Sequence, residues 1–119
     1  MEFSYSAKAQ EYIARLQNFM AQEVYPAEKA YYQTFSHSPD HTKWQQPEIM
    51  ESLKAKAKAA GLWNLFSPHA EHGLNNADYA PLAEITGRSF IAPEVFNCNA
   101  PDTGNMEVLI KYGSPEQQK

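Results

Sequence analysis

The chain of 119 residues is long enough to form one domain around a single buried core. Hydrophobic residues make up 43% of it and charged residues 20%, a balance typical of a folded globular domain and not of a disordered segment. The formal net charge of −4 argues against a nucleic-acid partner, and the single cysteine excludes an internal disulfide and a paired-cysteine metal site.

The sequence also lacks the usual membrane and export signals. It contains no uninterrupted apolar run of about 18 residues, the length that a membrane-spanning helix needs. The first residues, MEFSYSAKAQEY, have neither the basic and apolar regions of a secretory signal nor the arginine-rich character of an organelle transit peptide. We therefore expect a cytoplasmic protein without a membrane partner.

Taken in chain order, the first segments repeat their hydrophobic residues with the spacing of an α-helix. Residues 6 to 25 repeat apolar side chains every three or four positions, as one face of a helix requires. Pro26 either kinks this helix or begins the next one, which is expected over residues 26 to 33. Residues 34 to 46 have no period and predict a loop.

The clearest helix begins at Pro47 and is expected to end with Gly61 as a left-handed C-terminal cap. The apolar run over residues 62 to 66 follows at once and is expected to plug the core. Three further helices are predicted: at about 77 to 88 after a cap at Asn75 or Asn76, around 94 to 98, and around 103 to 112, where Gly113 ends the helix. The predicted fold class is all-α, a helical bundle of about five to six helices.

The last eight letters, YGSPEQQK, predict the start of one more helix. Ser114 suits the N-cap, Pro115 suits the first helical position, and Gln117 can close a capping box. A helix of about four residues cannot offset its nucleation cost. We therefore expect the fold to continue beyond Lys119.

The residues that could carry chemistry form no recognisable site. His37 and His41 have the i, i+4 spacing of two metal ligands on a helix, but Pro39 breaks that helix and no further ligand is marked, so no metal site is predicted. Cys98 has no identifiable histidine partner and is expected to be a structural thiol. Phosphate-binding glycine loops and nucleophile elbows are absent. The residues alone therefore indicate an acidic helical domain with no catalytic residue.

Four segments nevertheless form a pattern: VYPAEKAYY (24 to 32), LKAKAKAAGLWNLF (53 to 66), LAEITGRS (82 to 89) and EVFNCNAPDTGNMEVL (94 to 109). In order and spacing they resemble the N-terminal helical domain of the acyl-CoA dehydrogenase family, and the resemblance covers nearly the whole chain. It implies that residues 1–119 form that domain, and that the middle β domain and the C-terminal helical domain of the family are absent from this sequence.

The resemblance also implies a function. In the family, a glutamate of the C-terminal domain removes the α-proton of an acyl-CoA thioester while a hydride passes from the β-carbon to FAD, a step of fatty acid metabolism. This chain would therefore belong to an FAD-dependent acyl-CoA dehydrogenase, usually a homo-oligomer, and would be inactive alone because that glutamate and most FAD contacts lie in the missing domains.

By position, the resemblance assigns one wall of the acyl pocket to six residues: Val95, Phe96, Asn99, Ala100, Thr103 and Gly104. The alternative for Val95, Phe96 and Ala100 is that they pack the helical core. Gly104 could permit a close approach of backbone and ligand, or could merely allow a tight helix start.

Two other interpretations of the whole chain stay open. One is a stand-alone helical protein-interaction module, derived from that family, that binds a partner through the face that the middle domain would cover. The other is a small helical bundle that binds a metal or a ligand, for which the sequence offers little support.

Overall fold

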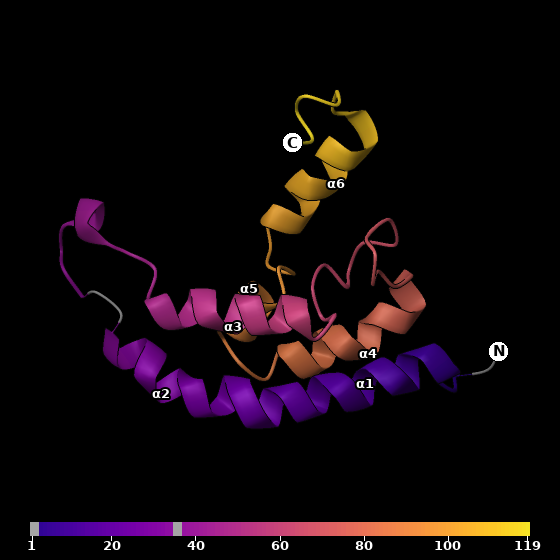
Figure 1. The fold of residues 1–119 in the computed structure, drawn as a ribbon, viewed down its shortest axis with the longest axis horizontal. Coiled ribbons are helices and arrows are strands. Elements are labelled where there is room, and N and C mark those ends of the chain that lie inside the picture. Colours follow the sequence, from indigo (N-terminus) through magenta and orange to yellow (C-terminus); the bar gives the residue numbers. More distant parts are fainter. Residues whose placement is uncertain (1–2, 35–36) are drawn as a thin grey trace.

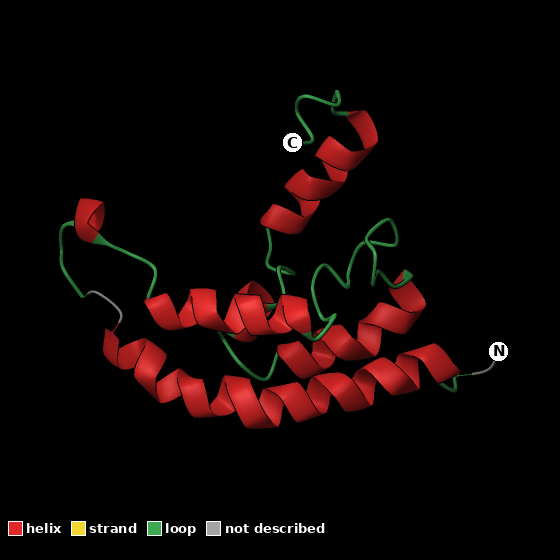
Figure 2. Cartoon of the chain, viewed as in Figure 1, coloured by secondary structure: helices red, strands yellow, loops and turns green. Residues whose placement is uncertain are grey.

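The computed structural model describes residues 3–34 and 37–119, and this part of the chain contains helices and no strand (Figures 1 and 2). The predicted all-α fold is confirmed. The elements are α1 (Ala7–Phe19), a π-helical turn η1 (Met20–Val24), α2 (Tyr25–Thr34), a 3-10 turn η2 (His41–Lys43), α3 (Glu48–Ala59), α4 (Asn76–Thr86), α5 (Ala92–Val95) and α6 (Asp102–Tyr112). Within the described residues, no helix has the length and apolar character needed to cross a membrane.

The first three elements form one long, bent helix that runs along one side of the molecule (Figure 1). The Ser6 hydroxyl caps its start and accepts a hydrogen bond from the Ala9 N–H at 3.0 Å. Pro26 is the second residue of α2 and has no N–H to bond to the preceding turn. The wider π-helical turn lies directly before it, so the chain bends at the proline and continues.

The third helix and its cap agree closely with the sequence. α3 follows Pro47, and Gly61 adopts a φ of 65°, which confirms the predicted left-handed cap. The Arg15 guanidinium donates a hydrogen bond to the Ala60 carbonyl and so satisfies one of the free carbonyl groups at the end of α3. The following run packs into the core as expected, with Leu62, Leu65 and Phe66 buried.

The later helices also lie near their predicted positions. Asn75 caps α4 by accepting a hydrogen bond from the Asp78 N–H at 2.9 Å. The short α5 begins two residues earlier than expected, at Ala92, and α6 ends before Gly113 as expected. After α6 the chain forms a single turn, in which the Gln117 N–H bonds to the Ser114 carbonyl at 2.9 Å and the Ser114 N–H bonds to the Gln117 side chain at 2.9 Å.

The predicted loop over residues 34 to 46 is only partly within the described residues, because residues 35 and 36 lie outside them. The described remainder contains η2, which begins after Asp40, whose carboxylate accepts a hydrogen bond from the Thr42 N–H at 3.1 Å.

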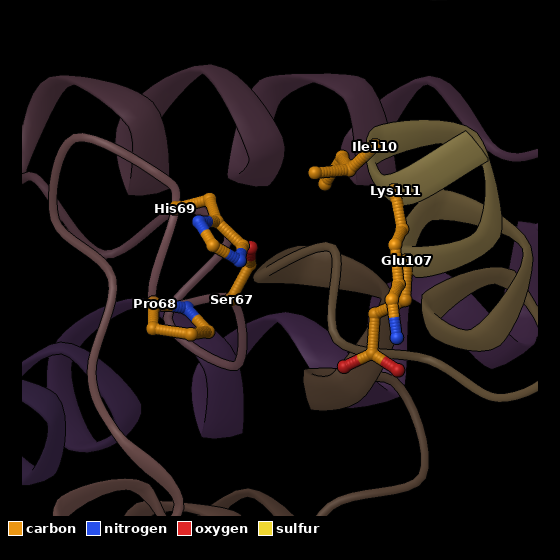
Figure 3. Close-up of a pocket in the computed structure, with 6 residues that line it drawn as sticks. All are labelled: Ser67, Pro68, His69, Glu107, Ile110 and Lys111. Atoms are coloured by element: carbon orange, nitrogen blue, oxygen red, sulfur yellow. The ribbon is translucent and has the colours of Figure 1, made fainter. Parts of the chain in front are cut away.

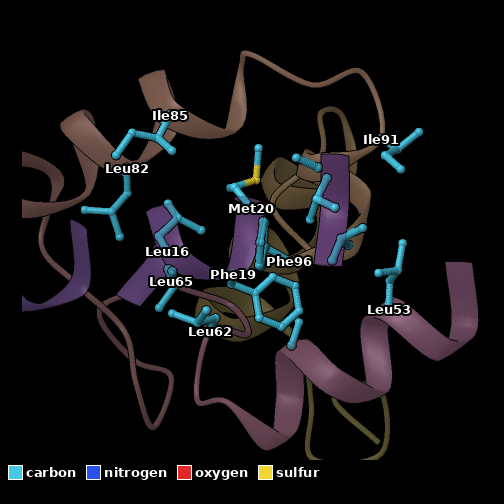
Figure 4. Packing of buried hydrophobic residues seen from close by; sticks show 14 of the residues in the cluster. Leu16, Phe19, Met20, Leu53, Leu62, Leu65, Leu82, Ile85, Ile91 and Phe96 are labelled. Carbon is cyan, nitrogen blue, oxygen red and sulfur yellow. The ribbon is translucent and has the colours of Figure 1, made fainter. Parts of the chain in front are cut away.

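A single apolar core lies between the long N-terminal helix, α3, α4 and α5 (Figure 4). At its centre the rings of Phe19 and Phe96 meet edge to face, with centroids 5.4 Å apart. α6 contributes no buried residue and extends away from the bundle (Figure 1). The core is therefore made by α1 to α5 and the segments that join them, and α6 contributes no buried residue to it.

Candidate functional site

The six residues predicted to line an acyl pocket fall into two groups. Val95 and Phe96 are fully buried in the core. Asn99, Ala100 and Gly104 are exposed, and Thr103 is half-buried; these four lie on the connection from α5 to α6 and on the first turn of α6. The structure thus brings the six together along one stretch of chain, but only the second group faces outward.

Local structure fixes where this stretch begins. Asn97 has a φ of 54°, the left-handed conformation, so the chain turns sharply away from the core directly after Phe96. The Asn97 side-chain amide donates a hydrogen bond to the side-chain oxygen of Asn64 at 2.6 Å. The outward-facing residues therefore follow a turn that a hydrogen bond connects to Asn64, in the segment that follows α3 in the sequence.

Cys98, the next residue, is turned back towards the fold. Its thiol donates a hydrogen bond to the Phe96 carbonyl at 3.3 Å. Burial raises the pKa of this thiol, and hydrogen bonds from Tyr79 and from the backbone of Phe66 and Leu65 offset part of that rise. Because the thiolate is the reactive form, this environment supports the prediction of a structural cysteine.

One hollow of about 440 Å³ contains a predicted site residue. Its walls come from α2, α3, α5 and the segments beside them: Tyr31, Gln46, Met50, Glu51, Lys54, Phe90, Ile91, Glu94 and Asn99. Phe90 is 94% exposed, an unusual position for a large apolar ring. Asn99 therefore lines a cleft that also contains the exposed ring of Phe90 and several charged side chains.

Those charges are paired within the cleft. The Lys54 ammonium lies 2.6 Å from a carboxylate oxygen of Glu94 and 3.3 Å from one of Glu51. Partial burial lowers the pKa of Lys54, but the hydrogen bonds and charges of Glu94 and Glu51 outweigh it, so the pKa lies above its usual value. Burial, with the charges of Tyr32 and Glu94, raises the pKa of Tyr31. The cleft thus holds a charged lysine that its own two carboxylates neutralise.

A second hollow, of about 560 Å³, lies between α6 and the loop that follows the buried run (Figure 3). Ser67, Pro68 and His69 line one side, and Glu107, Ile110 and Lys111 of α6 line the other. The Ser67 hydroxyl is buried and has no hydrogen-bond partner among the described residues. None of the six predicted residues lines this hollow, so the sequence did not indicate it.

Gly104 is distinctive because the described structure gives no reason for a glycine there. A Cβ atom added at this position would meet nothing within 4 Å. The glycine is therefore not required by packing within the described residues.

Two contacts at the site were not predicted from the sequence: the bond between Asn64 and Asn97 and the ion pair between Lys54 and Glu94. Partners in the first pair are 33 residues apart, and the ion pair joins α3 to α5. One signal was available: asparagine is the residue after glycine that most often adopts the left-handed conformation, and both positions are asparagines in short connections. Among the described residues, no group of three or more potential ligands could hold a metal ion.

The known proteins to which this chain is similar are acyl-CoA dehydrogenases by name. Acyl-CoA dehydrogenase family member 11 of Gallus gallus is 52% identical over 118 residues, which cover 98% of this chain and 15% of that protein. A Mycobacterium tuberculosis protein assigned as the acyl-CoA dehydrogenase FadE2 is 53% identical over 121 residues, which cover 99% of this chain and 29% of that protein. This sequence is homologous to acyl-CoA dehydrogenases. No family model matches it.

The structural comparison agrees. A solved structure assigned as an acyl-CoA dehydrogenase from Mycobacterium abscessus superimposes with a TM-score of 0.81 at 51% identity, covering 97% of this chain and 30% of that one. The all-helical fold matches the N-terminal helical domain of acyl-CoA dehydrogenases. The chain spans 15% to 30% of the length of these acyl-CoA dehydrogenases.

Proposed function

We propose that this chain is the N-terminal helical domain of an FAD-dependent acyl-CoA dehydrogenase, which removes hydrogen from the α and β carbons of an acyl-CoA thioester. The observation that carries the proposal is identity above 50% to acyl-CoA dehydrogenases along 98% of the chain. In this proposal the middle β domain and the C-terminal helical domain complete the enzyme, which assembles as a homo-oligomer.

Neither of the two hollows described above favours the diphosphate of FAD. A flavin dinucleotide carries a negatively charged diphosphate, which proteins hold with backbone N–H groups or unpaired cations. In the cleft beside α5 the only lysine is neutralised by Glu51 and Glu94, and beside α6 Lys111 is accompanied by Glu107. We therefore assign FAD to the complete enzyme, with most of the groups that hold it outside this chain.

The proposed contribution of this chain is a wall of the acyl pocket. In this proposal Asn99, Ala100, Thr103 and Gly104 face the ligand, and their position outside the core supports the assignment. Val95 and Phe96 form the layer behind them, since both are buried and Phe96 packs against Phe19. A substitution in the outward group is expected to act on substrate preference, and one in the buried pair on stability as well.

The test begins with the native polypeptide that carries this sequence, purified from its source. We expect a product several-fold heavier than the 13.5 kDa of residues 1–119, with bound flavin and with acyl-CoA-dependent reduction of an electron acceptor. Purified 1–119 is the matched control, and it is expected to show no such reduction. A native product of 13.5 kDa without activity would contradict the proposal, and activity of 1–119 alone would contradict the assignment of catalysis to other domains.

One observation favours a second candidate, a helical protein-interaction module. α6 has no buried residue, and its Val108, Leu109, Ile110 and Tyr112 are all exposed large hydrophobics. A module of this kind would use α6 to bind another protein. The mass of the native product separates the two, because the module requires a stable product of the size of this chain.

A further inference from the structure

Two asparagines with the same unusual backbone meet in the described structure. Asn64, in the turn after α3, has a φ of 59°, and Asn97, directly after α5, has a φ of 54°; they are the only described residues other than glycine with positive φ. One hydrogen bond of 2.6 Å joins their side chains, and a second, of 3.1 Å, runs from the Asn64 N–H to the carbonyl of Phe96, the residue before Asn97. The end of α5 is thereby tied to a segment 33 residues earlier.

Asn97 also reaches α6. The nitrogen of its side-chain amide lies 3.5 Å from the sulfur of Met106, in the second turn of that helix. A side-chain amide has two N–H donors, so one can serve Asn64 and the other Met106. α6 has no buried residue whose packing would orient it. The contact between Asn97 and Met106 can therefore influence the direction of this helix.

The backbone alone does not account for asparagine at these positions. Glycine adopts a positive φ without the steric cost that other residues have, so a turn that only needed this conformation would be satisfied by glycine. Asparagine adds a side chain that can donate and accept hydrogen bonds, and here both side chains are used. A change from asparagine to glycine therefore removes the bonds while it preserves the turn.

We propose that Asn97, together with Asn64, is a positioning residue that fixes the direction of residues 98 to 104 and of α6 relative to the helical core. In the complete enzyme the pair would set where the wall of the acyl pocket stands. The first statement concerns this chain alone, and the second rests on the proposed function. Neither asparagine need touch the substrate, because both act through the segment that they hold.

The first experiment measures the direction of α6 in the 1–119 chain by residual dipolar couplings of its backbone amides. In the unchanged chain we expect α6 and the core to share one alignment. In Asn97→Gly we expect the couplings of α6 to shrink while those of α1 and α4 stay. Asn76→Gly, at an exposed asparagine at the start of α4, is the matched control and should leave α6 aligned.

Two further variants separate the contact of Asn97 with Asn64 from its contact with Met106. Asn64→Gly leaves the Met106 contact in place and removes only the side-chain bond, so it tests the pair even if Asn97→Gly does not fold. Met106→Leu keeps the volume but removes the sulfur acceptor, and is expected to loosen α6 without affecting the turn. Couplings of α6 that are unchanged in Asn97→Gly and in Asn64→Gly would overturn the proposal.

The second experiment uses the longer native polypeptide and compares kcat/KM across acyl-CoA substrates of different chain length. We expect Asn97→Gly to change the preferred length and to lower kcat/KM for the best substrate by on the order of 10-fold, since small displacements of a binding wall are costly. The double variant Asn97→Gly with Asn64→Gly should have the effect of Asn97→Gly alone, because Asn97→Gly already removes the bond between the two side chains. A lower melting temperature with an unchanged length profile would contradict the positioning role. A polypeptide without any acyl-CoA-dependent activity would contradict the proposed function and leave the result on α6 standing.

Discussion

Gly104 lies in the first turn of α6, where the described structure has no contact that requires the absence of a side chain. Glycine costs a helix up to about 1 kcal/mol relative to alanine, and an isolated helix of this length is marginal. We therefore expect Gly104→Ala to increase the helical population of α6 in the 1–119 chain. Slower amide hydrogen exchange over residues 105 to 112 would show it.

The same substitution should have the opposite effect on function if the backbone at Gly104 lies against the acyl chain of a substrate. In the longer native polypeptide we expect Gly104→Ala to lower kcat/KM for acyl-CoA. Asn105→Ala is the matched control, because it is exposed in the same turn and should stabilise α6 without loss of activity. Equal activity of the two variants would mean that the glycine serves no close approach.

The individual features that could be predicted from the sequence are those that depend on neighbouring residues, such as helix caps. The cap at Gly61 and the cap at Asn75 each depend on a few neighbouring residues, and both are found. The bond from Asn97 to Asn64 and the ion pair from Lys54 to Glu94 depend on how helices pack. Since no local pattern encodes a contact between distant segments, these parts of the candidate site required the structure.

The N-terminal caps of α1 and α4 are linked to each other through Asp78. The Ser6 hydroxyl begins α1 by accepting from the Ala9 N–H, and it also donates to the Asp78 carboxylate of α4 at 2.7 Å. Asp78 in turn accepts from the Asn75 side chain at 3.1 Å. The loss of a capping hydroxyl usually costs about 1 kcal/mol, and here an inter-helix bond is lost with it. We expect Ser6→Ala to lower the free energy of unfolding by about 1–2 kcal/mol in urea denaturation.

A double-mutant cycle with Asp78→Ala tests whether the two caps are coupled. If the shared bond contributes, the double variant loses less stability than the sum of the two single variants. Ser52→Ala, at an exposed serine within α3, is the control and should change stability by less than about 0.5 kcal/mol. Strict additivity would mean that the bond between Ser6 and Asp78 contributes no stability.

Among elements, the sequence predicted which segments are helical more readily than how they join. Pro26 indicated a kink or a new helix, and a missing N–H alone could not decide between them. The structure contains a π-helical turn and a bend, because the buried Met20 and Val24 keep the long helix packed on the core through the irregular turn. Packing of this kind decides the geometry of a junction and has no period that a sequence reveals.

The whole molecule is less compact than its length requires. Its radius of gyration is 15.7 Å, whereas a compact domain of this length has about 13.5 Å. Two parts extend from the bundle in Figure 1, α6 and the loop that carries η2, and both increase this radius. The run of exposed hydrophobics on α6 does not form the stripe of an amphipathic helix, so its isolation was not apparent from sequence periodicity.

This exposed helix leads to a prediction for the 1–119 chain. Single exposed apolar side chains are common, but four on one unburied helix form a surface that water solvates poorly. We expect the chain to self-associate as its concentration rises, measured by sedimentation velocity. Val108→Lys should shift it towards the monomer, because the charge cannot be desolvated in an apolar contact.

Phe90→Lys is the matched control, because Phe90 is the most exposed large hydrophobic residue among the described residues but lies outside α6. It should leave self-association unchanged, and an equal effect of both variants would mean that general apolar exposure drives association. In the longer native polypeptide, Val108→Lys is expected to have the opposite, harmful effect. If further domains cover α6 there, Val108→Lys would bury a charge and lower the melting temperature of that protein. The same substitution would then improve the short chain and damage the long one, a result that a helix exposed in both could not produce.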